Sequence, residues 1–79
     1  MSKLPSLSTQ QVSRALRQAG FVDAPVRGKG SHTALTKIEP DGTTRLVIVP
    51  DRKDIPIGTL IAIIKQAGLT RDQFLDLLR

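Results

Sequence analysis

Three features on which small proteins often rely are absent from this sequence. None of the 79 residues is a cysteine, so disulfide bridges, cysteine-based zinc fingers and thiol nucleophiles are excluded. No apolar run reaches the roughly 18 residues that a membrane-spanning helix needs. The N-terminus also lacks the hydrophobic stretch of a secretory signal. These absences favour a protein of the reducing cytoplasm, and we expect it to work there without a membrane partner.

Aromatic residues are nearly absent as well, since Phe21 and Phe74 are the only two. Domains that bind single-stranded nucleic acid by stacking its bases need exposed aromatic rings, so that class is disfavoured. Positive charge, by contrast, is abundant: 12 Lys and Arg against 7 Asp and Glu give a net charge of +5. Such an excess in a short chain favours a polyanionic partner, nucleic acid first, bound through its phosphate backbone.

Capping residues and apolar spacing predict three helices. Ser8 and Gln11 form a capping box before an apolar stripe over residues 9–19, and Gly20 is a typical C-terminal stop. A second helix is expected to open at Gly58 and to end before Gly68. The capping pattern then repeats at Thr70 and Gln73, which predicts a short third helix.

Between the first two helices the sequence predicts a three-stranded antiparallel meander. The expected strands cover residues 21–26, 31–38 and 44–49, and the turn signal of residues 40–43 separates the last two. The whole chain, residues 1–79, then reads as one α+β domain: a helix, a three-stranded sheet, a helix and a short C-terminal helix. This order resembles the double-stranded-RNA-binding domain, with helices on one face of the sheet and the other face open.

His32 is the candidate catalytic residue, because it is the only histidine and the only side chain whose ordinary pKa lies near neutral pH. The alternation of a strand places it opposite Leu35, the expected core residue, so we expect it on the open face. The turn before it is basic and rich in glycine, a type that can hold a phosphate; its residues, the predicted RNA-binding set, are Arg27, Gly28, Lys29, Gly30 and Ser31. A phosphodiester bound there would suit attack by its own ribose 2′-OH, with His32 as general base or acid. A lone histidine without converging ligands does not make a structural zinc site, so we expect neither a metal nor a cofactor.

Several short motifs, in this order and spacing, resemble the HicA toxins of bacterial HicAB toxin–antitoxin pairs over residues 4–78. They are Lys3-Leu4-Pro5, Ala19-Gly20-Phe21, Lys29-Gly30-Ser31-His32, Pro40-Asp41-Gly42, Val47 to Pro50, Gly58-Thr59-Leu60, Ile64 to Leu69, and Phe74-Leu75. The resemblance implies an mRNA interferase with a fold like that of double-stranded-RNA-binding domains, whose catalytic histidine is here His32. It also implies neutralisation by a HicB-like antitoxin. Members that resemble this chain often carry a second histidine where Arg52 stands, and we expect position 52 to lie outside the proton-transfer chemistry.

Two other functions remain open at this point. One is a non-catalytic module that binds double-stranded or structured RNA with the same fold and charge. The other is a structural or regulatory protein whose basic face is incidental. A pure binder has no need of a histidine beside a glycine turn, and an incidental basic face would release RNA at moderate salt. The residues leave the second proton-transfer group open between Lys29, a substrate phosphate and water.

Overall fold

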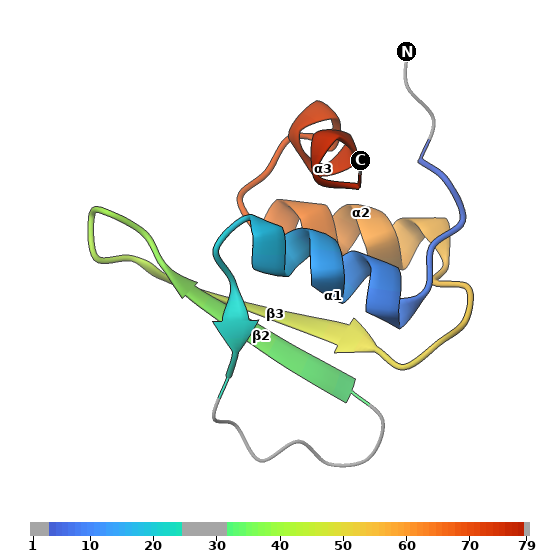
Figure 1. Ribbon diagram of the computed structural model, residues 1–79, viewed down its shortest axis with the longest axis horizontal. Coiled ribbons are helices and arrows are strands. Elements are labelled where there is room, and N and C mark those ends of the chain that lie inside the picture. The colour runs from blue at the N-terminus through green and yellow to red at the C-terminus, as the bar shows by residue number, and fades with distance from the viewer. Residues whose placement is uncertain (1–3, 25–31, 79) are drawn as a thin grey trace.

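The predicted order of elements is present in the computed structural model, which describes residues 4–24 and 32–78 (Figure 1). The elements are α1 (Thr9–Gln18), β1 (Val22–Asp23), β2 (His32–Ile38), β3 (Thr44–Pro50), α2 (Ile57–Gln66) and α3 (Arg71–Leu77). The strands form one antiparallel sheet in the order β1-β2-β3. Helices α1 and α2 lie on the same face of this sheet (Figure 1), so the α+β architecture expected from the sequence is confirmed.

The capping residues fix where the helices begin and end. Both capping boxes are formed: the side chain of Ser8 accepts from Gln11 N–H, and that of Thr70 accepts from Gln73 N–H. Gly20 follows α1 with a φ of 102° and Gly68 follows α2 with a φ of 73°, a left-handed conformation that favours glycine. After each glycine the next residue donates back into the helix, as Phe21 N–H does to Leu16 O at 3.0 Å.

The first strand is shorter than predicted. The sequence suggested a strand over residues 21–26, but β1 contains only Val22 and Asp23, so that prediction was wrong in extent. Phe21 cannot pair with the sheet through its N–H, because that N–H donates to Leu16 O at the end of α1. Residues 25 and 26 lie outside the described residues. The third strand, β3, runs one residue further than the predicted range 44–49. It ends at Pro50, which pairs with His32.

The core lies between the helices and the inner face of the sheet. Along β2 and β3 the buried residues alternate with exposed ones: Leu35, Val47 and Val49 are fully covered, whereas Leu46 and Ile48 are not. Burial of such side chains contributes about 1.5–3 kcal/mol each. The remaining core side chains come from the three helices and from the segments that adjoin them: Leu7, Val12, Ala15, Leu16, Phe21, Ile55, Leu60, Ile63, Ile64, Ala67 and Phe74.

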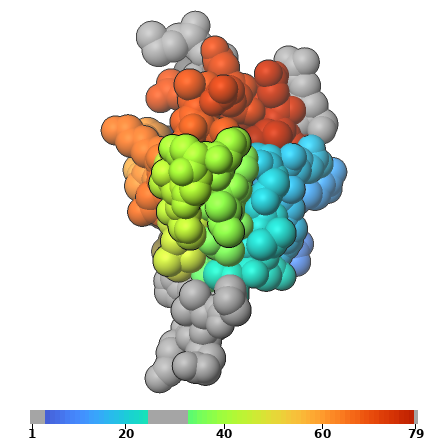
Figure 2. All heavy atoms as spheres, turned by 90° about the vertical axis from the view of Figure 1, so that its left-hand side faces the viewer, coloured from blue at the N-terminus to red at the C-terminus, as the bar shows by residue number. Residues whose placement is uncertain are grey.

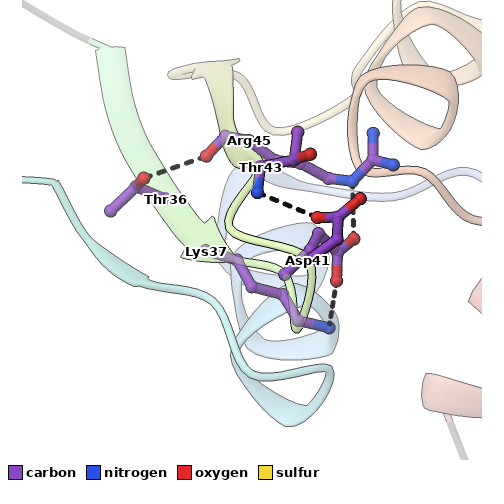
Figure 3. Close-up of polar contacts among 6 residues, drawn as sticks. Thr36, Lys37, Asp41, Thr43 and Arg45 are labelled. Carbon is purple, nitrogen blue, oxygen red and sulfur yellow. Dashed lines mark hydrogen bonds and ion pairs between the residues drawn. The ribbon is translucent and has the colours of Figure 1, made fainter.

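A polar cluster on the β2–β3 hairpin connects the hairpin to the C-terminal ends of α1 and α2. Figure 3 shows two of its residues, Lys37 and Arg45. Arg45 Nε donates to Glu39 Oε2 at 2.6 Å, and Lys37 Nζ lies 3.8 Å from Glu39 Oε1. Lys37 also sits over the ring of Phe21, 5.8 Å from its centroid, while the Arg45 guanidinium lies against Gly68. Figure 2, which views the molecule from the hairpin end, shows the hairpin in the foreground with α3 above it. The cluster places a cation at the C-terminal end of each long helix, where the helix dipole favours one.

Candidate functional site

The backbone of His32 opens β2, at the end of the sheet opposite the hairpin turn. Its Cα partner is Pro50, the last residue of β3. Ala24, the last described residue after β1, donates its N–H to Ala34 O at 2.9 Å, so β1 and β2 stay paired close to this end. The five predicted RNA-binding residues, from Arg27 to Ser31, lie outside the described residues, and their role remains a prediction.

The N-terminus of α1 is bonded to the chain that follows β3. Thr9 Oγ1 donates to Pro50 O and accepts from Arg52 N–H at 2.7 Å. Thr9 N–H in turn donates to Arg52 O at 3.0 Å. Because Pro50 pairs with His32, these bonds hold three elements together at one corner: the start of α1, the start of β2 and the segment after β3.

Further bonds extend this connection along the chain. Ile55 N–H donates to Leu7 O at 2.8 Å, and Ser6 Oγ donates to Asp54 Oδ1 at 2.5 Å. The side chains of Leu7 and Ile55 are both buried in the core. The loop of residues 51–56 is therefore fixed against the segment before α1 and has a defined place beside the corner, despite its high charge.

A shallow hollow of about 470 Å³ opens at this corner. We call it the α1–β3 hollow; its lining residues are Ser8, Thr9, Gln10, Asp51, Arg52 and Lys53. Two N–H groups of the first helical turn already have partners there, since Gln11 N–H donates to Ser8 Oγ and Thr9 N–H donates to Arg52 O. The charged groups available to an anion in the hollow are thus the exposed side chains of Arg52 and Lys53, with Asp51 the one carboxylate among the lining residues.

Sequence reasoning missed the contribution of Thr9, Arg52 and Lys53. The capping pattern predicts Thr9 only as the first residue of a helix, and residues 51–57 have only the composition of a charged loop. The sequence does contain one relevant signal, the run Val-Pro-Asp-Arg-Lys at the end of the predicted strand 44–49. In an antiparallel pair the end of one strand lies beside the start of its partner, so this run follows β3 to the end of the sheet where β2 begins. What the sequence did not reveal is that α1 starts at the same edge.

Two broader features of the described residues bear on function. Within residues 4–24 and 32–78, no three His, Cys, Asp or Glu side chains are grouped so as to hold a metal ion. In the same part of the chain no helix has both the length and the apolar character needed to cross a bilayer.

Comparison with known proteins identifies the family. Residues 9–69 match the model for the HicA toxin of bacterial toxin–antitoxin systems, a span that runs from the start of α1 to just after the end of α2 and includes the whole sheet. No curated protein matches the chain. The matched span contains His32, Thr9 and the two cations of the α1–β3 hollow, so the candidate site lies within the family's shared region.

Proposed function

We propose that this chain, which belongs to the HicA toxin family and is the toxin of a toxin–antitoxin pair, binds and cleaves mRNA with His32 as the catalytic residue. The observation that carries the proposal is the position of His32. Its Cα partner, Pro50, is bonded to Thr9, and Thr9 is bonded to Arg52. The only histidine therefore begins its strand beside a hollow that presents two cationic side chains.

The chemistry that suits this arrangement is transfer within the RNA itself. A ribose 2′-OH attacks the adjacent phosphorus, a new 2′-O–P bond forms, and the bond from phosphorus to the 5′-oxygen of the next nucleotide breaks. His32 accepts the 2′-OH proton or donates one to the leaving oxygen, since histidine as a residue type can do either near neutral pH. Cations stabilise the negative charge that builds up on the phosphorane. We assign this role to Arg27 and Lys29 of the glycine turn, together with the backbone of Gly28, Gly30 and Ser31.

Arg52 and Lys53 have a different task in this proposal. Exposed cations beside a cleavage site neutralise the phosphates on either side of the reacting one, which supplies affinity and positions the strand. An arginine is permanently charged and is a poor proton carrier. Arg52 accordingly binds the RNA backbone and takes no part in proton transfer, in line with its expected place outside the proton-transfer chemistry.

The partners follow from the family. A toxin of this kind is paired with an antitoxin, and we propose a HicB-like protein that acts in the cytoplasm, where mRNA is available. In this proposal the antitoxin inhibits cleavage by covering the site.

The test is incubation of the purified chain with a long single-stranded RNA in the presence of EDTA. Cleavage to shorter products ending in a 2′,3′-cyclic phosphate is the expected result, because the proposed reaction needs no metal. A shift of the RNA in a native gel without shortening would instead support the non-catalytic RNA-binding module.

A further inference from the structure

A second hollow, of about 310 Å³, lies between α1, α3 and the segment before α1. We call it the α1–α3 hollow. Its apolar lining includes Leu7, Ala15 and Leu78, and its polar lining includes Ser6, Gln11 and Arg14. Arg14 is the one charged residue among the described lining residues. In Figure 1 α3 lies above α1 and α2 and the sheet lies below them, so this hollow is on the side of the helices away from the sheet.

The polar groups of the α1–α3 hollow are mainly hydrogen-bond donors. Gln11 Oε1 accepts from Ser8 N–H at 2.9 Å, so the capping box fixes the side-chain amide of Gln11 and leaves its NH₂ group as the donor. Arg14 is exposed, and no carboxylate of residues 4–24 and 32–78 forms an ion pair with it. A guanidinium adds a planar surface and five N–H donors. The hollow therefore combines an apolar floor with a rim of donors.

The α1–α3 hollow adjoins the α1–β3 hollow across the first turn of α1. Residues 8–10 line the α1–β3 hollow, whereas Gln11 and Arg14 line the α1–α3 hollow. Ser6 Oγ donates to Asp54 Oδ1 at 2.5 Å, which bonds the wall of one hollow to the loop that carries the two cations of the other. A helix with its side chains is about 10–12 Å across. An RNA strand whose phosphates lie against those two cations therefore has a short path over the helix to Arg14.

We propose that the α1–α3 hollow is a nucleobase subsite, in which one base of the bound RNA lies on the apolar floor beneath the Arg14 guanidinium. Proteins recognise unpaired bases by stacking them on arginine planes as well as on aromatic rings, and by hydrogen bonds to the base edges. Both aromatic rings of this chain are buried in the core, so an arginine takes their place for a single base. The proposal rests on the RNA function proposed above and names the place where the toxin reads sequence.

Size and charge favour a base over other occupants. The volume of the hollow is at the lower end of the roughly 300–1,000 Å³ usual for small-molecule sites, which suits one flat ring system. The charge of its described lining is positive, and the whole chain carries +5, so an anionic ligand is attracted and a second copy of the chain is repelled. A base arrives attached to phosphates and brings the negative charge that a neutral apolar segment lacks.

The experiment compares two ligands of the full chain. One is a short 2′-O-methyl RNA, which cannot be cleaved by attack of its own 2′-OH, and the other is the same backbone without bases. Arg14→Ala removes the guanidinium, and Arg14→Lys keeps the charge without the plane. Arg17→Ala is the control, because it removes an exposed arginine of the same helix that does not line the hollow. Fluorescence anisotropy measures affinity, and circular dichroism verifies that each variant is folded.

The expected result is a ratio of affinities that depends on Arg14. The wild type should bind the RNA more tightly than the base-free backbone by about 5- to 100-fold, the usual contribution of one stacked base. Arg14→Ala and Arg14→Lys should lose most of this ratio, while Arg14→Lys binds the base-free backbone as the wild type does. Arg17→Ala should weaken the binding of both ligands alike and keep the ratio.

Three results overturn the proposal. A wild-type ratio near one would mean that no base is bound. A ratio that Arg14→Lys retains would mean that Arg14 acts through its charge alone, on a phosphate. The same ratio in every folded variant would leave the hollow to another occupant. A wild-type chain that shows the expected ratio but cleaves no unmodified RNA would remove the proposed cleavage and support the subsite.

Discussion

Replacing Thr9 with valine tests the geometry of the candidate site most directly among the described residues. The substitution keeps the shape of a side chain that is 8% exposed but removes its hydroxyl. Pro50 O then loses a donor and Arg52 N–H loses an acceptor. A fully buried polar group left without a partner costs about 1–3 kcal/mol. Arg52 is exposed and Pro50 is only half-buried, so water recovers part of this loss and we expect a destabilisation of about 1–2 kcal/mol.

In a domain of this size that loss corresponds to a fall in melting temperature of about 4–16 °C. Cleavage of RNA should also fall, since the segment carrying Arg52 is no longer fixed beside the start of β2. Thr9→Ser is the matched control: it gives up one methyl group but keeps both bonds, so its cleavage rate should stay close to wild type. Thermal unfolding by circular dichroism and a cleavage time course measure the two effects. A Thr9→Val protein that melts and cleaves like the wild type would refute this description of the corner.

Three other predictions concern the hairpin, the basic turn and the partner. Gly68→Ala should destabilise the chain by roughly 1–2 kcal/mol, the cost expected of left-handed backbone, because Gly68 has a φ of 73°. The new Cβ would lie 2.5 Å from Arg45 Cζ, the end of a flexible side chain that can move aside, so urea unfolding in an Arg45→Ala background should show nearly the same loss, and a much smaller loss there would contradict this. Arg27→Ala and Lys29→Ala should each lower RNA affinity. Each should also reduce the slope of log affinity against log salt concentration by roughly 0.7 to 0.9 per lost phosphate contact, and unchanged slopes would show that the basic turn does not contact the RNA backbone. Diethylpyrocarbonate should modify His32 in the free toxin but not in the antitoxin complex, and equal labelling would indicate inhibition from a distance.

Local signals predicted most of the fold. The Ser8–Gln11 and Thr70–Gln73 capping boxes and the glycines at positions 20 and 68 act within a few residues of chain, so the sequence is enough to place the helix ends. The extent of β1 was not predictable in the same way. Its length depends on whether Phe21 N–H bonds to the helix or to the sheet, and both partners are compatible with the local sequence.

The candidate site was predicted less completely, because it depends on contacts between distant segments. His32 is marked by being the only histidine, and its place at the start of a strand was expected. The bonds from Thr9 to Pro50 and Arg52 join residues more than 40 positions apart, and no pattern along the chain indicates them.

The central claim is that His32 carries out the cleavage, and replacing it with alanine is the most direct measurement. The variant should fold and bind RNA with wild-type affinity, while its cleavage rate in EDTA falls by about 10²–10⁴-fold, the usual contribution of a general acid or base. Circular dichroism and a native gel verify folding and binding in the same preparation. A folded His32→Ala protein that cleaves RNA at the wild-type rate would contradict the assignment.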